Sequence, residues 1–347
     1  MLSILDESGR ASRDAGFDAE SLRAVHRAMV LTRKLDIRML AMQRQGEMGT
    51  FAPGLGQEAT QIGQVWPLQQ SDWFSPSYRS FGAQLWRGWT IDGLMLLWFG
   101  FFEGFEIPEG VNDLPFSIVI GSHVLPAVGV AMGMRFKKDP SVMVVNFGDG
   151  AFSQGAIAEA MNFASVYKAP CVFVVENNGY AISTKAEHQA GITELAKRGP
   201  GFGIPSVRVD GNDILAMMQA SKAAVEHARA GNGPYLVEAV TYRMSVHTTA
   251  DDPKVYRDDA EVEAWEQRCP IKQFEIYLEN KGILSRDEMD RVAADCQQEV
   301  LEGREKFRTR VKANPREIFD YMFDEMPPEL RRQQEEYFAK LTRKGVE

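Results

Sequence analysis

The sequence has few cysteines and no cysteine motif. Its 347 residues include only three, Cys171, Cys269 and Cys296, which form neither a C-x-x-C pair nor a spacing typical of a zinc site. Neither a zinc module nor a disulfide framework is therefore indicated. Thiols of this ordinary kind are typical of a reducing compartment, so we expect a cytoplasmic protein.

Long hydrophobic runs are also missing. The longest apolar run, residues 94–102, is too short to cross a bilayer, and it is expected to form core or a subunit contact. The chain begins with a short apolar run followed at once by Asp6 and Glu7, which fits neither a secretory signal nor an acid-poor transit peptide. We expect residues 1–17 to be a flexible N-terminal arm.

Excess positive charge and nucleotide-binding motifs are missing as well. The net charge of -9 and the pI near 5.3 argue against binding of nucleic acid or anionic membranes. Gly148, Gly150 and Gly155 do not give the G-x-G-x-x-G of a dinucleotide site, and no Gly-Lys-Ser/Thr supplies a P-loop. These absences disfavour a nicotinamide-dependent oxidoreductase.

The most informative stretch, residues 142–184, predicts a βαβ unit. Residues 142–147 and 171–176 are continuous apolar runs typical of buried parallel strands. Residues 154–168 between them have the pattern of an amphipathic helix, which would serve as the right-handed crossover. We therefore predict an α/β fold in which a parallel sheet carries helices on both faces.

Polar clusters follow both predicted strands. Gly148-Asp149-Gly150 follows the first strand and Asn177-Asn178 the second, at the edge where such sheets bind ligands. Carboxylate and amide oxygens are ligands that Mg²⁺ or Ca²⁺ takes, and a helix beginning after Gly150 would present free N–H groups to a phosphate. The pattern predicts a metal-bridged diphosphate site. A turn that only caps the helix is the alternative for the GDG sequence alone.

The spacing of these clusters resembles the thiamine diphosphate motif, with 26 residues, 151–176, between GDG and NN. The segment GDGAFSQGAIAEAMNFASVYKAPCVFVVENNGYAIST is similar along its whole length to the alpha subunit of 2-oxo acid dehydrogenases, and the resemblance extends from about residue 21 to residue 332. It implies the thiamine diphosphate-binding fold. It also implies that Asp149, the Asn178 side chain and the Tyr180 carbonyl bind Mg²⁺, while Gly150 and Ala151 line the diphosphate.

Two earlier segments match the same family. An arginine after an aromatic residue, as in Tyr78-Arg79, is more often a surface residue beside a core tyrosine, but the family's Tyr-Arg pair contacts the diphosphate. Some relatives have a substrate-facing histidine two residues later, where this chain has Phe81. Residues 118–120 are expected to form a short buried strand. In the family the backbone around Ile118 and Ile120 holds the aminopyrimidine end of the cofactor.

His247 belongs to a second signature, residues 243–257, which matches the family pattern R-x-x-x-H-[ST]-x-x-D-D-P-x-x-Y-R. A lone histidine in a polar loop is usually only solvated. This one follows a predicted strand at residues 235–242, which ends at the same edge of the sheet, and the resemblance implies that His247 contacts the cofactor near the reacting centre. His123 stands where relatives have glutamine, and we interpret it as a structural hydrogen-bonding histidine.

The remainder of the chain is predicted to be mostly helical. A helix spans about residues 18–45 with Asp18 as its cap, and Gln57 and Glu58 are interpreted as first-turn residues of the next helix rather than cofactor neighbours. From about residue 261 the sequence is charged and helical. We predict a single thiamine diphosphate-binding domain over residues 18–347 that includes this C-terminal helical region.

The resemblance also implies an activity and partners. The expected activity is that of a pyruvate dehydrogenase (acetyl-transferring) alpha subunit, which decarboxylates its 2-oxo acid substrate oxidatively and passes the acyl group to a lipoyl group of an acyltransferase component. In the family the glutamate that activates the cofactor belongs to a separate beta subunit. We therefore expect an α₂β₂ assembly that is inactive without the beta subunit, with residues 94–102 and the small-residue helix at 124–136 as candidate contacts.

The substrate is the least determined feature. The segment GFEIPEGVNDLP resembles bacterial pyruvate dehydrogenases and favours pyruvate, whereas RGPGFGIPSVRVDGND and MPPELRRQQE resemble the branched-chain 2-oxo acid dehydrogenases. The branched-chain enzyme is therefore the alternative. A non-catalytic binding protein of the same fold is disfavoured because Asp149, Asn178 and His247 are all intact.

Overall fold

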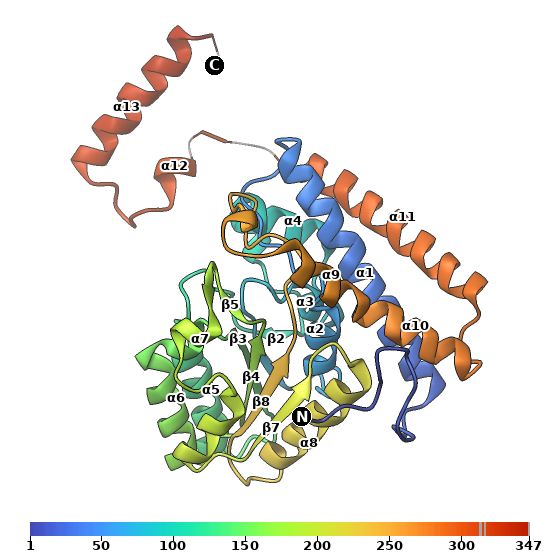
Figure 1. Cartoon of the computed structure of the whole chain (residues 1–347). Helices are drawn as coiled ribbons and strands as arrows, with labels where there is room; N and C mark the ends of the chain where they lie inside the picture. Colours follow the sequence, from blue (N-terminus) through green and yellow to red (C-terminus); the bar gives the residue numbers. More distant parts are fainter. Residues whose placement is uncertain (312–313, 316, 346–347) are drawn as a thin grey trace. The chain divides into compact units, whose positions relative to one another are not determined.

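A six-stranded sheet lies at the centre of the protein in a computed structural model that describes residues 1–311, 314–315 and 317–345 (Figure 1). All its neighbouring strands run parallel, in the order β2-β1-β3-β4-β8-β7. The strands are β1 (Trp73–Ser75), β2 (Asn112–Asp113), β3 (Met143–Gly148), β4 (Cys171–Asn177), β7 (Ser206–Asp210) and β8 (Tyr235–Val240). The predicted parallel sheet with its central βαβ unit is confirmed.

Two helices cover one face of the sheet. They are α5 (Val124–Lys137) and α6 (Gly155–Val166), and α6 is the predicted crossover between β3 and β4. Alternate residues of the two strands point into this layer, because successive side chains of a strand face opposite sides. The resulting core includes Met143, Val145 and Phe147 of β3 and Cys171, Phe173 and Val175 of β4.

A second helical layer covers the other face (Figure 1). There α8 (Ile214–Arg229) contacts β4, β7 and β8, and α2 (Glu58–Val65) packs on α8. The helices α1 (Ala19–Arg44) and α3 (Phe81–Trp86) extend this layer. As predicted, Asp18 caps α1, since its side chain accepts a hydrogen bond from the N–H of Ser21. The expectation of helices on both faces is therefore confirmed.

The remaining elements are short or follow the sheet. The α-helices are α4 (Ile91–Phe99), α7 (Ala186–Gln189), α9 (Asp259–Gln267), α10 (Pro270–Asn280), α11 (Arg286–Arg310), α12 (Glu317–Asp320) and α13 (Pro328–Arg343). The 3₁₀-helices are η1 (Phe102–Phe105), η2 (Ala151–Ser153), η3 (Leu195–Phe202) and η4 (Pro253–Val255). A small antiparallel hairpin, β5 (Tyr180–Ala181) and β6 (Thr184–Lys185), follows β4.

The expected buried strand at residues 118–120 is wrong. Ile118, Val119 and Ile120 are 65%, 69% and 43% exposed and lie in a turn. Flanking serines form this turn, because the Ser117 hydroxyl accepts the Val119 N–H and the Ser122 hydroxyl donates to the Ser117 hydroxyl. Local hydrogen bonds of this kind compete with strand pairing, and here they prevail over the apolar character of the run.

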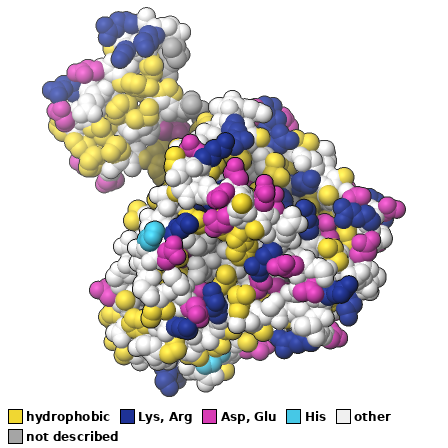
Figure 2. All heavy atoms as spheres, in the orientation of Figure 1, with side chains coloured by type: hydrophobic (Ala, Val, Ile, Leu, Met, Phe, Trp, Pro, Cys, Tyr) yellow, Lys and Arg dark blue, Asp and Glu magenta, His cyan; other side chains and the backbone are white. Residues whose placement is uncertain are grey.

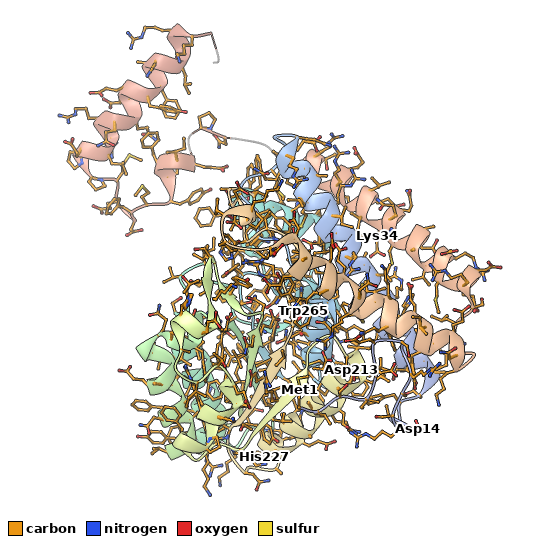
Figure 3. All side chains as sticks on the ribbon, in the orientation of Figure 1. Met1, Asp14, Lys34, Asp213, His227 and Trp265 are labelled. Carbon is orange, nitrogen blue, oxygen red and sulfur yellow. The ribbon has the colours of Figure 1, made fainter. Side chains whose placement is uncertain are left out.

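The N-terminal segment is docked on the sheet rather than free. Leu2 forms a parallel bridge to Val209 at the edge of β7, and Ile4 and Leu5 are 1% and 4% exposed. One carboxylate oxygen of Asp213 accepts the N–H groups of both Ile4 and Leu5, and Figure 3 shows Met1 and Asp213 on the same side of the molecule. The expectation of a flexible arm over residues 1–17 does not hold for these residues, because their apolar side chains complete the core.

The predicted single domain over residues 18–347 also differs from the structure. The chain divides into two compact units, Met1–Glu305 and Lys306–Glu347. The first unit holds the sheet and its helical layers. In the second unit, Phe319 of α12 packs against Tyr337 and Phe338 of α13.

No helix in the part of the chain that the structure describes combines the length and apolar character needed to cross a bilayer. The run at residues 94–102 instead lies largely within α4, where Leu94, Met95, Leu96 and Leu97 are buried. Of its two expected roles, core or subunit contact, the structure supports the core.

The docked N-terminal segment gives a stability prediction. Ile4→Ala should lower the free energy of unfolding by about 2–4 kcal/mol, because it removes buried methyl groups and leaves a cavity. Ser12→Ala, at an exposed side chain of the same segment, is the control and should have little effect. Urea unfolding followed by circular dichroism compares the two variants. If Ile4→Ala and the control variant are equally stable, the N-terminal segment is not docked and residues 1–17 form a flexible arm.

Candidate active site

A cavity of about 240 Å³ lies at the carboxyl ends of the central strands. It is lined by Asp149 directly after β3, by Asn178 directly after β4, and by Arg243 and His247 of the segment after β8. The predicted site residues that line it are Tyr78, Arg79, Ile120, Asp149, Gly150, Ala151, Asn178, Tyr180 and His247. Ile118 is the predicted residue that does not line it. Parallel strands thus bring residues 78 to 247 together at one edge, as the sequence led us to expect.

Asp149 has a buried carboxylate with an unused oxygen. Its side chain is 2% exposed, and Oδ2 has no hydrogen-bond partner among the described residues. Burial raises the pKa of this carboxyl to about 6, although the Gly150 and Asp149 N–H groups act in the opposite direction. An orphaned carboxylate oxygen is costly unless a ligand satisfies it, so the arrangement fits a cation.

The two neighbouring asparagines differ in what they do. The Asn177 amide donates to Glu238 Oε1 at 2.8 Å and to the Thr193 carbonyl at 3.1 Å, so it ties β4 to its surroundings. Asn178 lines the cavity, and its side-chain oxygen accepts the Tyr180 N–H at 3.2 Å. Of the two asparagines, Asn178 is the one that lines this cavity.

The helix expected from about residue 154 starts at Gly155, and a 3₁₀ turn, η2, lies between Gly150 and this helix. Gly150 and Ala151 still line the cavity. A Cβ atom at Gly150 would lie 3.0 Å from Ala181 Cβ, so the close approach of the hairpin loop explains the glycine.

Two buried guanidinium groups surround His247. Arg243 Nη1 lies 2.6 Å from His247 Nδ1, and Arg79 Nη2 lies 3.3 Å from the same nitrogen and donates to the His247 carbonyl at 3.2 Å. Because both neighbours are donors, Nδ1 must act as the acceptor and Nε2 carries the proton. Burial, followed by the charges of Arg79 and Arg243, lowers the His247 pKa to about 3. The ring is therefore neutral near pH 7.

Neither arginine has a carboxylate partner. Arg79 is 5% and Arg243 2% exposed, and no ion pair of the described residues includes either of them. Burial lowers the Arg243 pKa to about 10, and the nearby Arg79 charge acts in the same direction. Two buried cations at the wall of one cavity favour an anionic ligand such as a phosphate group.

A buried acid forms the floor of the cavity. Glu176 is 3% exposed and accepts hydrogen bonds from the Gln57 and Asn146 amides, each at 3.0 Å. Burial raises its pKa to about 7. The Asn146 oxygen in turn accepts from the Ser80 hydroxyl at 2.9 Å, so the floor supports the neighbouring Arg79.

Sequence reasoning missed several residues of this site. Arg243 stands four positions before His247, and the R-x-x-x-H spacing was the available signal. Gln57 does begin α2, but its amide reaches Glu176 and so supports the cavity, which helix pattern alone could not reveal. Ile182, with φ of 58°, also lines the cavity in a conformation that β-branched residues rarely adopt.

His123 and Phe81 both make structural contacts. His123 Nε2 is 2.7 Å from the Asn146 carbonyl, which supplies the structural hydrogen bond we expected, although His123 also lines the cavity. Phe81 is 1% exposed and packs against Phe51 with a ring distance of 5.8 Å. Phe81 does not line the cavity, and its phenyl ring has no group that could act as an acid or a base.

The sequence model of the family described as "Dehydrogenase E1 component" matches residues 26–316. The chain belongs to this family. It is 42% identical over 321 residues to the pyruvate dehydrogenase E1 component subunit alpha of Acholeplasma laidlawii, covering 92% of this chain and 93% of that relative. It is 38% identical over 344 residues to the proteins of the same name from Staphylococcus epidermidis and Staphylococcus aureus, covering 98% of this chain and 93% of each relative. The resemblance to alpha subunits of 2-oxo acid dehydrogenases is confirmed.

The charges around His247 give a pH prediction. Since its folded pKa of about 3 lies below the ordinary 6.5, the folded protein binds fewer protons between these values. The stability contributed by this neutral ring is present above pH 6.5 and is lost as the pH falls toward 3. Arg243→Met should raise the pKa of His247, which NMR titration of the labelled ring can measure.

In this variant the pKa of His247 should still lie below the ordinary 6.5, because burial is the largest cause that lowers it and the substitution leaves the ring buried. The exposed Arg13→Met is the control and should leave the titration unchanged. His247→Gln identifies the resonance by its loss. Titration of His247 near 6.5 in the unmodified protein would contradict this electrostatic account.

Proposed function

We propose that this chain is the diphosphate-binding alpha subunit of a thiamine diphosphate-dependent pyruvate dehydrogenase component. The observation that carries the proposal is the cavity, whose lining includes one unsatisfied carboxylate oxygen of Asp149 and two buried arginines, Arg79 and Arg243, that form no ion pair among the described residues. A metal-bridged diphosphate has the charges that such a site needs. Membership of the dehydrogenase E1 component family supports the same ligand.

The proposed ligand set is specific. Asp149, the Asn178 side chain and the Tyr180 carbonyl would hold Mg²⁺, and Gly150, Ala151 and Tyr78-Arg79 would hold the diphosphate. Groups of three or more His, Cys, Asp or Glu that could bind a metal are absent from the described residues. This fits Mg²⁺, which takes few protein carboxylates and completes its shell with water and phosphate oxygens.

Thiamine diphosphate, when bound, supplies the nucleophilic carbon and the electron sink for decarboxylation of a 2-oxo acid. The chain's own contribution is to bind and orient it. His247 retains its N–H at Nε2 because Arg79 and Arg243 occupy Nδ1, so this neutral ring can donate a hydrogen bond to an anionic oxygen. The buried walls of the cavity strengthen that donation by excluding water.

The carboxylates of the cavity support a divided site. Of its two acids, Asp149 is assigned to the metal and Glu176 is occupied by the amides of Gln57 and Asn146. Activation of the pyrimidine ring therefore needs a further carboxylate, which we assign to a beta subunit in an α₂β₂ assembly. The acyl group would then pass to a lipoyl group on the acyltransferase component.

An exposed apolar surface supports the same partner. Ile118 and Val119 beside the cavity, Phe136 of α5, and Phe163 and Val166 of α6 are each 46% to 72% exposed. In Figure 2 hydrophobic side chains are visible over the region where α5 and α6 lie in Figure 1. We propose that the beta subunit covers this surface, because apolar side chains of this size are normally buried in an obligate interface.

Pyruvate is the proposed substrate because the relatives of 38% to 42% identity are named pyruvate dehydrogenases. A branched-chain 2-oxo acid is the second candidate, on the resemblance of residues 198–213 and 326–335 to that enzyme. The three free cysteines support the proposed cytoplasmic location.

The metal assignment is tested at Asp149. Asp149→Ala should abolish Mg²⁺-dependent binding of thiamine diphosphate by the complex with the beta subunit, since it removes the only charged protein ligand proposed for the metal. Titration calorimetry measures the affinity. Asp139→Ala, at an exposed aspartate before β3, is the control. Unchanged affinity in the Asp149 variant would refute the assignment.

The divided site makes a separate prediction. The purified chain alone should release no CO₂ from pyruvate, and addition of the beta subunit with thiamine diphosphate and Mg²⁺ should restore turnover. Comparison of kcat/KM for pyruvate and 3-methyl-2-oxobutanoate then decides between the two substrates. Robust turnover by the chain alone would contradict the divided site, and a preference for 3-methyl-2-oxobutanoate would reverse the substrate assignment.

A further inference from the structure

The loop that follows β4 separates two cavities. Asn178 and Tyr180 line the active-site cavity, and they also line a second cavity of about 390 Å³ on the other side of the loop. The backbone of this loop is held locally by the β5–β6 pairing and by the Ala186 N–H, which donates to the Gly179 carbonyl at 2.9 Å. Cavities on both sides leave it few packed neighbours from the rest of the fold. Gly179 between them, with φ of 81° and no atom near a Cβ position, adds no contact of its own.

The Tyr180 side chain attaches this loop to residues elsewhere in the fold. Its hydroxyl donates a hydrogen bond to Glu261 Oε2 at 2.7 Å, and its ring packs against the rings of Tyr242 and Tyr256 at 6.3 and 5.9 Å. Tyr180 is 6% exposed, and its hydrogen bond to Glu261 is partly buried.

Glu261 is held in turn by α9. Glu261 and Trp265 stand four residues apart and so lie on the same face of the helix. Trp265, labelled in Figure 3, stacks on Tyr242 with a ring distance of 5.2 Å and an angle of 4° between the planes. One face of α9 therefore contacts both the Tyr180 hydroxyl, through Glu261, and the Tyr242 ring, through Trp265.

The same cluster reaches the His247 segment. Tyr256 packs on Tyr180 through its ring, while its hydroxyl donates to Asp251 at 2.6 Å and accepts from Arg243 at 3.2 Å. Asp251 also accepts the His247 N–H at 2.8 Å. Tyr256 and Asp251 thus connect the Tyr180 loop to the segment that holds Arg243 and His247, which both line the active-site cavity.

We propose that Glu261 is a positioning residue for the metal, which acts through the Tyr180 hydroxyl to fix the Tyr180 carbonyl and the Asn178 side chain at the cavity. The proposal rests on the proposed function, because it requires a cation at Asp149 and Asn178. It assigns a role to Glu261, a charged and partly buried residue of the C-terminal helical region. Glu261 is a positioning residue and makes no contact with the metal itself.

A double-mutant cycle tests the proposal in the complex with the beta subunit. Mn²⁺ replaces Mg²⁺, and electron paramagnetic resonance measures free Mn²⁺ at saturating thiamine diphosphate. Glu261→Ala and Tyr180→Phe should each weaken Mn²⁺ binding by about tenfold, the usual effect of losing an outer-shell partner. The double variant should bind no more weakly than either single variant, because both changes break the same hydrogen bond.

Two further variants separate positioning from general stability. Glu261→Gln keeps an oxygen acceptor for the Tyr180 hydroxyl and should retain Mn²⁺ affinity. Glu263→Ala removes an exposed glutamate from the same helix and should change nothing. If Glu261→Ala does not assemble, Tyr180→Phe and Glu261→Gln decide the matter, with weakening in the first and retention in the second as the supporting result.

The opposing outcomes are equally defined. Wild-type Mn²⁺ affinity in Glu261→Ala or in Tyr180→Phe, or losses in the double variant that multiply those of the single variants, would overturn the role of Glu261. These outcomes leave the proposed function standing. Absence of Mn²⁺ binding in the unmodified complex with thiamine diphosphate would instead refute the proposed function.

Discussion

The site depends on buried charges that the chain does not neutralise by itself. Among the described residues, Arg79 and Arg243 are almost fully buried and form no ion pair, and one oxygen of Asp149 has no hydrogen bond. Buried charges that are not compensated are unfavourable, so a cavity that holds three such groups favours a compensating ligand. A cation beside Asp149 and an anion beside the two arginines would satisfy all three at once. The same charges keep His247 neutral, so they determine its chemistry as well as the ligand's.

The sheet makes this arrangement possible by holding the groups on rigid elements. Asp149 and Asn178 each follow a long central strand, and the register between β3 and β4 aligns Gly148 with Glu176. Beneath the cavity, Glu176 gathers the amides of Gln57 and Asn146, which come from α2 and β3. The ligand-facing groups thus stand on loops at the strand ends, and the paired strands below hold these loops in place.

The sequence was sufficient for the parts of the fold that are decided locally. Continuous apolar runs identified β3 and β4, and the polar residues directly after them identified the ligand edge. The failures concern contacts between distant residues. Leu2 pairs with Val209, more than two hundred positions away, so the docking of the N-terminal segment has no local signal. Arg243 reaches the cavity because β8 ends beside β4, which brings the segment of Arg243 and His247 to Asn178.

The wrong prediction at residues 118–120 has a different cause, and it bears on the assembly. An apolar run is expected to be buried, and Ile118, Val119 and Ile120 are instead exposed next to the cavity. Local serine hydrogen bonds explain the turn but not the choice of three large apolar side chains in it. If a second subunit covers them, they are buried in the assembly. The apolar run then predicted burial in the complex rather than in the single chain. The uncompensated charges and the exposed apolar residues therefore support the same proposal, in which a ligand completes the cavity on one side and the beta subunit covers it on the other.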